Sequence, residues 1–178
     1  TAASGWNGAF LAEVARLGLD MKARTHGVFD IAQGNLEQRI KAFIGQRGAK
    51  PAPVTEENVV RIQGDKVVAN GPVDLNGIAK GWMADQVAQK LHEHGVRGFV
   101  NAGGDIARPQ GLVHIDGPYG GTIATLQTTW NVATSGTSRR RRDEVTHRYD
   151  PRTGQIGAPH DQVTVLSRTS CAEADALG

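Results

Sequence analysis

The chain has 178 residues, which suits a single domain, and 39% of them are hydrophobic, which is enough for a core. The formal charge of +2 is too small to indicate a nucleic-acid-binding protein. The single cysteine, Cys171, excludes an intrachain disulfide and a cysteine-cluster zinc site. Glycine accounts for 23 residues, well above the roughly 7% of average proteins, so many tight turns are expected.

In chain order, apolar spacing predicts helices over residues 8–24 and 35–44, followed by a glycine- and proline-rich loop. A β-hairpin is predicted from Val59 to Ala69, with its turn at Gly64 and Asp65.

The strongest helix is predicted from Ile78 to His94, and a short buried strand is predicted at Phe99 and Val100. The apolar side of that helix is expected to comprise Ile78, Trp82, Val87, Ala88 and Leu91. Short strands separated by glycine follow up to about residue 166, and a last helix begins at Cys171. Helices in the first half and strands in the second predict an α+β fold, in one domain spanning residues 1–178.

Two glycine-containing segments indicate a nucleotide ligand. Val73–Gly81 leads into the strongest helix and carries Asp74 and Lys80, and Asn101–Asp105 forms a sharp turn at a strand end. Main-chain N–H groups at a helix start, the helix dipole and a lysine together suit a phosphate. The alternative is that Asp74 is only a helix-start acid and Lys80 a solvated lysine.

Three other segments carry polar groups with a structural and a functional interpretation. The turn Ala133–Thr137 either donates hydroxyls to phosphate or is an ordinary turn, and His147 is either a general base or a structural histidine. Glu173 and Asp175 either compensate a helix dipole or bind a hard cation such as Mg²⁺. The arginine run 139–142 is followed at once by two acids, which favours a solvated rim over a nucleic-acid contact.

Taken together and in order, these segments resemble the ApbE family, the FAD:protein FMN transferases. The family's runs D-x-G-G-I-A-K-G, N-A-G-G-D, A-T-S-G, H-x-x-D-P-x-T-G and A-x-A-D-A-L match residues 74–81, 101–105, 133–136, 147–154 and 172–177. Asn76 stands where the family usually has glycine, and an upstream G-x-F-D run is also family-like, at Gly27, Phe29, Asp30 and Gly34.

The resemblance implies an enzyme that binds FAD with Mg²⁺, moves FMN onto a Thr or Ser hydroxyl of a target flavoprotein, and releases AMP. It also leaves open an FAD pyrophosphatase, which forms FMN and AMP, and a non-catalytic flavin-binding module.

By the family's pattern, Asp175 and the carbonyl of Ala79 would bind the metal. Lys80 would lie near the phosphates, and His147 would take the proton of the acceptor hydroxyl. The nucleotide would be held by Asp74, Asn76, Gly77, Asn101, Ala102, Gly103, Gly104 and Asp105, with help from Ser135 and Gly136.

Members of the family are usually longer than 178 residues, so the chain is expected to be incomplete at both ends relative to the family. The resemblance suggests an exported or periplasmic protein, with membrane association only through a possible N-terminal anchor before Thr1.

Overall fold

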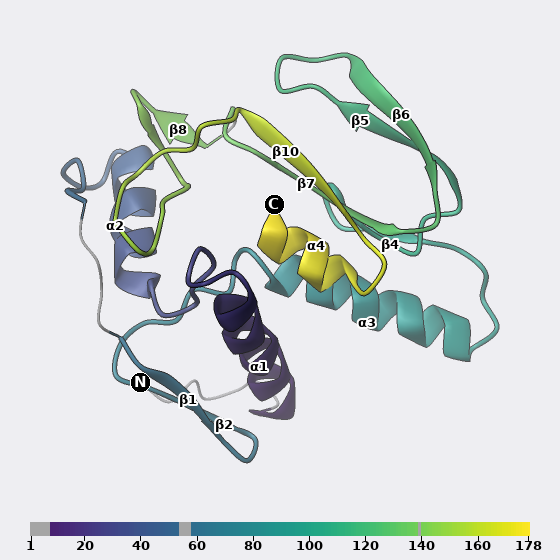
Figure 1. The fold of residues 1–178 in the computed structure, drawn as a ribbon, viewed down its shortest axis with the longest axis horizontal. Coiled ribbons are helices and arrows are strands. Elements are labelled where there is room, and N and C mark those ends of the chain that lie inside the picture. The colour runs from purple at the N-terminus through teal and green to yellow at the C-terminus, as the bar shows by residue number, and fades with distance from the viewer. Residues whose placement is uncertain (1–7, 54–57, 139) are drawn as a thin grey trace. The chain divides into compact units, whose positions relative to one another are not determined.

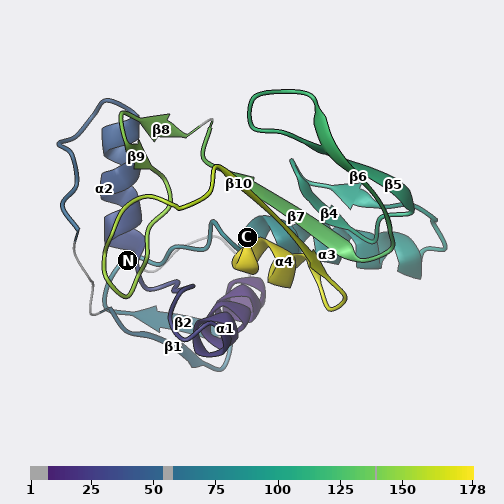
Figure 2. The same ribbon diagram turned by 45° about the horizontal axis from the view of Figure 1, so that its top comes forward.

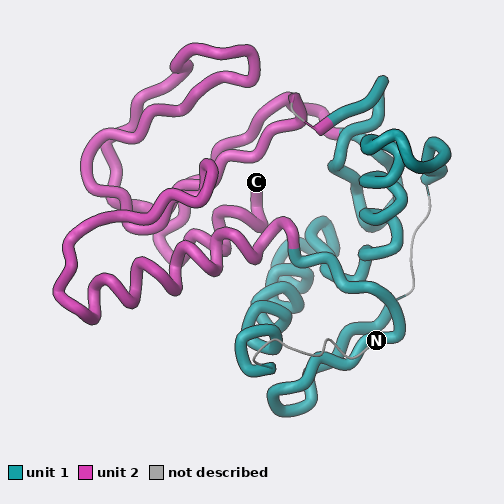
Figure 3. Tube along the Cα trace, turned by 180° about the vertical axis from the view of Figure 1, so that it is seen from behind, with its two compact units in different colours: residues 1–75, 141–157 teal, residues 76–140, 158–178 magenta. Residues whose placement is uncertain are grey.

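A computed structural model describes residues 8–53, 58–138 and 140–178 (Figure 1). The chain divides into two compact units, each built from two stretches of sequence (Figure 3). The first unit comprises residues 1–75 and 141–157, and the second comprises residues 76–140 and 158–178. The expectation of one domain over residues 1–178 stays a prediction.

The first unit contains two helices and two small antiparallel hairpins (Figure 1). Its elements are α1 (Gly8–Arg24), α2 (Gly34–Ile44), β1 (Val60–Gln63), β2 (Lys66–Ala69), β8 (Arg141–Arg142) and β9 (Val145–Thr146). The predicted helices and the β1–β2 hairpin are confirmed. Gly64, in the turn of that hairpin, has φ 58°, a conformation that costs glycine little.

Apolar residues of the first unit gather in two clusters. One joins α2 to β9 through Leu36, Ile40, Phe43 and Val145. The other surrounds the fully buried Ile31, at the loop between α1 and α2. This burial of an apolar helix stripe against strands is what holds such short elements together.

The second unit consists of two helices, a four-stranded antiparallel sheet and a separate two-stranded ribbon (Figure 2). Its elements are α3 (Ala79–Glu93), β3 (Val100–Asn101), β4 (Asp105–Ala107), β5 (Gly111–Asp116), β6 (Thr122–Thr128), β7 (Asn131–Gly136), β10 (Gln162–Ser167) and α4 (Cys171–Leu177). The sheet order is β10-β7-β4-β3, and β5 pairs with β6. The predicted α+β class, with helices packed on an antiparallel sheet, is confirmed.

The buried face of α3 matches the predicted one only in part, since Ile78 and Ala88 are buried as expected. Its buried residues are Gly81, Ala84 and Ala88, whereas Val87 is 49% exposed. Small residues face inward because α4 and the sheet come close to the helix, so side-chain size rather than hydrophobicity selects this face. Phe99, predicted to be buried, precedes β3 and is 54% exposed.

No helix in the described ranges is both long enough and apolar enough to traverse a lipid bilayer.

The α2 cluster provides a test of the first unit's core. We expect Leu36→Ala to lower the free energy of unfolding by about 2–5 kcal/mol, because the fully buried leucine would leave a cavity. Denaturant unfolding of the wild type and the variant measures this difference. Leu112, which is 63% exposed, serves as the control, and its alanine variant should stay within about 0.5 kcal/mol of wild type. Equal effects at both positions would contradict the assignment of this core.

Candidate functional site

The N-terminus of α3 is the centre of the candidate site in the second unit. The first N–H groups of any helix lack intrahelical acceptors, and here the N-cap residue, Ile78, supplies no side-chain hydrogen bond. The Gly81 N–H instead donates to Oδ2 of Asp175, on α4, at 3.2 Å. Ala79 and Lys80 lie in the same first turn. A helix start and an acidic residue separated by 94 positions in the sequence are therefore in direct contact.

Lys80 and Asp105 form an ion pair next to this helix start. The Lys80 ammonium donates to Oδ2 of Asp105, the first residue of β4. The Asp105 side chain is fully buried, whereas that of Lys80 is 46% exposed. Burial raises the pKa of the Asp105 carboxyl above its ordinary value, and the Lys80 charge opposes that shift. Oδ1 of Asp105 is buried and has no hydrogen-bond partner among the described residues.

The glycine turn between β3 and β4 brings more predicted residues to the same unit. Asn101 Oδ1 accepts from the Gly104 N–H at 3.0 Å, and the Ala102 N–H donates to the Asp105 carbonyl at 2.8 Å. Gly103 and Gly104 have φ angles of 72° and 105°, which L side chains rarely adopt. The backbone conformation of this turn is therefore enough to require glycine at positions 103 and 104, whether or not a ligand binds there.

The end of β7 lies against that turn. The Thr134 N–H donates to the Gly104 carbonyl at 3.1 Å. Ser135 and Gly136 follow in β7, and Gly178, after α4, is close enough to Ser135 that a Cβ built on it would lie 3.6 Å from the hydroxyl. The structure thus brings the 101–105 turn, the 133–136 segment and the end of α4 together, and the roles predicted for these residues stay predictions.

The two acids of α4 have different surroundings. Glu173 accepts from the Ser167 hydroxyl, while Asp175 is 5% exposed and faces the start of α3. The Asp175 carboxylate contacts the N-terminus of α3 through the Gly81 N–H. The structure therefore favours Asp175 as the acid that belongs to this site.

Asp74 and His147 belong to the first unit. Asp74 Oδ2 accepts from the Tyr149 hydroxyl at 3.1 Å, and its N–H donates to the Ile31 carbonyl at 2.8 Å. His147 is partly buried and directly follows β9. Burial raises the pKa of Tyr149 well above its ordinary value, and the Asp74 charge raises it further, so this phenol stays protonated.

Motif residues just before and at the start of α2 are held by local contacts of the first unit. Asp30 pairs with Lys22 at 2.8 Å and accepts from the Ala32 N–H at 3.0 Å. Gly34 lies so close to Pro72 that a Cβ would meet its carbonyl oxygen at 2.4 Å. Close packing therefore explains this glycine.

Two residues near the predicted ones were missed by the sequence interpretation. Tyr149 lies inside the 147–154 run and pairs with Asp74. Asp85, on α3, accepts from the N–H groups of Cys171 and Ala172. The available signal for Asp85 was its position one helical turn after Gly81, which places both residues on the same face of α3.

Cys171 lies beside the acids of this unit and is fully buried. Burial raises the pKa of its thiol well above the ordinary value, and the negative charges of Asp85, Asp105 and Asp175 act in the same direction. The thiol is therefore protonated at neutral pH, and we assign Cys171 a packing role rather than a nucleophilic one.

The donors at the start of α3 can be compared with the needs of Mg²⁺. Within the parts of the chain that the structure describes, no three His, Cys, Asp or Glu side chains gather to hold a metal by themselves. Mg²⁺ beside phosphates usually uses one or two carboxylates, with phosphate and water oxygens completing the shell. Asp175 and the buried Oδ1 of Asp105 are oxygen donors of this kind, and Ala79 lies two residues before Gly81. This donor set fits a Mg²⁺ ion that shares its coordination with a diphosphate.

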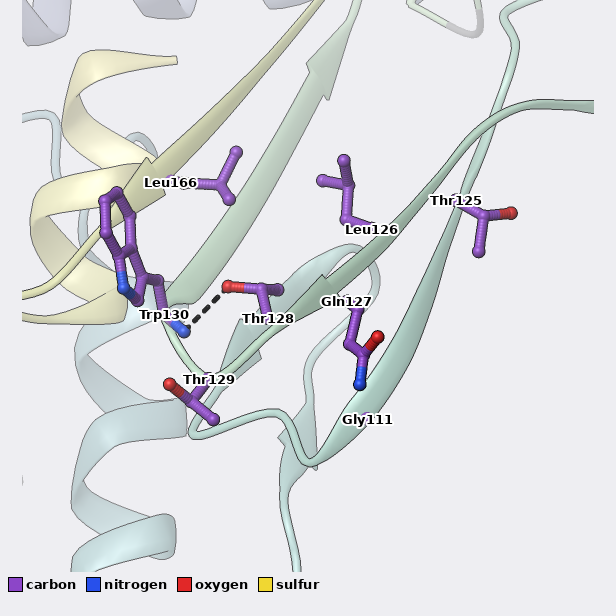
Figure 4. Close-up of a pocket in the computed structure, with 8 residues that line it drawn as sticks. All are labelled: Gly111, Thr125, Leu126, Gln127, Thr128, Thr129, Trp130 and Leu166. Carbon is purple, nitrogen blue, oxygen red and sulfur yellow. Dashed lines mark hydrogen bonds between the residues drawn. The ribbon is translucent and has the colours of Figure 1, made fainter.

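A separate pocket of about 620 Å³ lies beside β6 in the second unit (Figure 4). Its lining residues are Gly111, Thr125, Leu126, Gln127, Thr128, Thr129, Trp130 and Leu166. None of them is a predicted site residue, and none carries a carboxylate or an amine. The side chains that line this pocket therefore offer no charged group to a phosphate or a metal.

The ion pair yields a pH-dependent prediction. We expect Lys80→Met to lower the free energy of unfolding at pH 7 by about 1–3 kcal/mol, because it leaves the Asp105 carboxylate buried without its cation while solvent already screens part of the pair. Removing Lys80 raises the pKa of Asp105 further, so the folded state then binds more protons than the unfolded state. The difference in free energy of unfolding between wild type and Lys80→Met should therefore grow as pH rises above the ordinary carboxyl pKa. It should shrink as pH falls toward about 4.

Urea unfolding between pH 4 and pH 8 measures this dependence. Lys90→Met is the matched control, since Lys90 lies on the same helix in an exposed pair with Glu93. The electrostatic role would be contradicted if Lys80→Met lost no more free energy of unfolding than Lys90→Met, or if its loss were constant with pH.

Comparisons with known proteins identify the family of the chain. The family model described as the ApbE family matches residues 8–178. The flavin transferase ApbE of Vibrio cholerae is 26% identical, with a TM-score of 0.70, and the match covers 93% of this chain and 61% of that one. The ApbE protein of Thermotoga maritima and the apo flavinyl transferase ApbE of Pseudomonas stutzeri are each 24% identical. Their TM-scores are 0.77 and 0.76, and the matches cover 94% of this chain and 63% and 60% of theirs.

No curated protein matches the sequence. The chain spans about three fifths of the length of the solved structures that it resembles. With a match that runs from residue 8 to residue 178, the chain belongs to the ApbE family.

Proposed function

We propose that the protein is a Mg²⁺-dependent FAD:protein FMN transferase, which moves FMN from FAD onto a Thr or Ser hydroxyl of a target flavoprotein and releases AMP. Family membership supports this proposal, as does similarity to the Vibrio cholerae protein, which is itself a flavin transferase. In the proposal FAD is the substrate, and the second partner is a flavoprotein that carries a Ser/Thr acceptor segment. An exported or periplasmic location is part of the same proposal.

The observation that carries the proposal is the cluster at the start of α3. Lys80, in the first turn of α3, pairs with the buried Asp105 carboxylate, and the Asp175 carboxylate of α4 accepts from the Gly81 N–H of the same turn, whose first N–H groups have no intrahelical acceptor. Transfer of a phosphoryl-linked group depends mainly on positioning and on neutralising phosphate charge. This cluster supplies groups for both tasks.

The reaction forms a bond between the acceptor oxygen and the phosphorus attached to riboflavin, and it breaks the bond from that phosphorus to the AMP oxygen. Lys80 neutralises phosphate charge, and the N–H groups of Ala79 and Lys80 donate to phosphate oxygens. The 101–105 turn, Ser135 and Gly136 hold the nucleotide, together with Asp74, Asn76 and Gly77. Mg²⁺ bound through Asp175 and the Ala79 carbonyl would withdraw charge from the diphosphate.

The proton of the acceptor hydroxyl goes to His147 in this proposal, and the negative charge of the leaving AMP oxygen is balanced by the cations. The role of His147 rests on its place in the family's H-x-x-D-P-x-T-G run, at residues 147–154.

The transfer itself can be measured directly. We expect the protein, supplied with FAD, Mg²⁺ and a flavoprotein bearing a Ser/Thr-Gly-Ala-Ser/Thr segment, to add one FMN group to the acceptor and to release an equal amount of AMP. Intact-mass spectrometry follows the acceptor and chromatography follows AMP. An acceptor whose hydroxyl residue is changed to alanine is the control. AMP formed equally without an acceptor would show hydrolysis instead of transfer, and an unmodified acceptor under saturating FAD would refute the proposal.

The role of Asp175 is tested by Asp175→Asn, which retains one side-chain oxygen as an acceptor for the Gly81 N–H. We expect the Mg²⁺ concentration for half-maximal activity to rise at least about tenfold, because a neutral amide binds a hard cation weakly. Glu173→Gln is the matched control on the same helix, since Glu173 faces Ser167. The ligand assignment fails if both variants keep the wild-type Mg²⁺ requirement while circular dichroism shows native structure.

A further inference from the structure

Helices α3 and α4 lie side by side in both views of the fold, and each one supplies an acceptor for the N-terminus of the other (Figures 1 and 2). Asp85 of α3 accepts from the N–H groups of Cys171 and Ala172 through its two carboxylate oxygens, both at 2.9 Å. Asp175 of α4 accepts from the Gly81 N–H of α3 at 3.2 Å. The two helices therefore cap each other's N-termini with a carboxylate.

This reciprocal capping has a regular geometry. Asp85 lies four residues after Gly81, and Asp175 lies four residues after Cys171, so each acid is one helical turn from the helix start that its partner caps. Side chains at this spacing lie on the same face of a helix. One face of each helix therefore carries both a carboxylate and the N–H groups that donate to the carboxylate of the other helix.

The backbones touch at the same point. A Cβ built on Gly81 would lie 2.5 Å from the Cys171 carbonyl oxygen and 2.8 Å from the Ala172 Cα, which is closer than real Cβ atoms come. Any residue larger than glycine at position 81 would push the helix starts apart. The contact therefore tolerates little movement of α4 while both hydrogen-bonded carboxylates keep their partners.

The N-terminus of α4 also has a local cap. The Ser170 hydroxyl accepts from the Glu173 N–H at 3.0 Å. Ser170 thus caps a different N–H group from the two that Asp85 accepts, and its bonds stay within residues 167–173, whereas the bonds of Asp85 join α4 to α3. Asp85 fixes where α4 begins relative to α3.

We propose that Asp85 is a positioning residue for the metal and diphosphate site: by holding the start of α4 against α3, it places the Asp175 carboxylate at the N-terminus of α3. This inference rests on the proposed function for the identity of the ligand, and on the two pairs of helix-start contacts for the role of Asp85. Loss of Asp85 should release Asp175 from Gly81 and weaken cation binding without unfolding the unit.

Amide hydrogen exchange tests the positioning step without any metal. The acceptor of the Gly81 N–H is Asp175, so exchange at Gly81 reports directly whether Asp175 is in place. Asp85→Asn leaves one N–H at the start of α4 facing an amide donor, and we expect the Gly81 amide to exchange about tenfold faster, with amides of the β7–β10 ladder unchanged. Ser170→Ala is the matched variant, since it removes a cap from the same helix end but no tie to α3. It should change Gly81 exchange much less.

Mn²⁺ binding in the presence of FAD, followed by the electron paramagnetic resonance of free Mn²⁺, provides the second measurement. We expect Asp85→Asn to bind Mn²⁺ about tenfold more weakly than wild type, as for other residues that orient a metal ligand. Glu93→Gln, which removes a carboxylate from the exposed end of α3, should bind as wild type does.

The outcomes separate the inference from the proposed function. Wild-type protein that binds no Mn²⁺ with FAD would overturn the proposed metal site. Wild-type binding together with unchanged Gly81 exchange in Asp85→Asn, or with equal acceleration in Asp85→Asn and Ser170→Ala, would overturn the positioning role alone. Faster Gly81 exchange and weaker Mn²⁺ binding confined to Asp85→Asn support it.

Discussion

The need to satisfy the first N–H groups of α3 organises the second unit. Ile78 precedes the helix and has no polar side chain, so the acceptors come from other side chains, water or a ligand. Asp175 accepts from one of them, the Gly81 N–H, and with the two bonds of Asp85 it ties the last helix to the first helix of the unit. Gly81 has no side chain, so the start of α4 can approach α3 closely at the same residue whose N–H group donates to Asp175.

A buried carboxylate imposes the second constraint. Asp105 begins β4 with no exposed surface, and such a group is costly unless it is paired with a cation and hydrogen-bonded. Lys80 supplies the positive charge from the first turn of α3, which links the sheet to the helix start. The glycine turn before Asp105 and the segment after Thr134 are held to the same place by main-chain hydrogen bonds. The site is thus built from contacts that the fold itself requires.

The sequence predicted the elements whose signals are local. The apolar periodicity located α1 and the turn at Gly64 located the first hairpin, because both depend on neighbouring residues. The buried face of α3 was predicted only in part: Ile78 and Ala88 are buried as expected, but Val87 is exposed and Ala84 is buried where another helix approaches. In the same way, ordered motifs indicated Lys80 and Asp175 as site residues, but no local pattern indicates that Asp85 meets residues 86 positions later.

The charge balance around Cys171 bears on how an anionic substrate could be accommodated. The charges that act on its thiol are those of Asp85, Asp105 and Asp175 against that of Lys80. Helix N–H groups and one ammonium offset part of this negative charge, yet a diphosphate would add more of the same sign at close range. Repulsion between like charges in a partly buried site is costly, so a diphosphate is expected to bind with a divalent cation rather than ahead of it. In the proposed reaction, the acids near α3 would therefore favour joint binding of nucleotide and metal over neutralisation of the diphosphate by Lys80 alone.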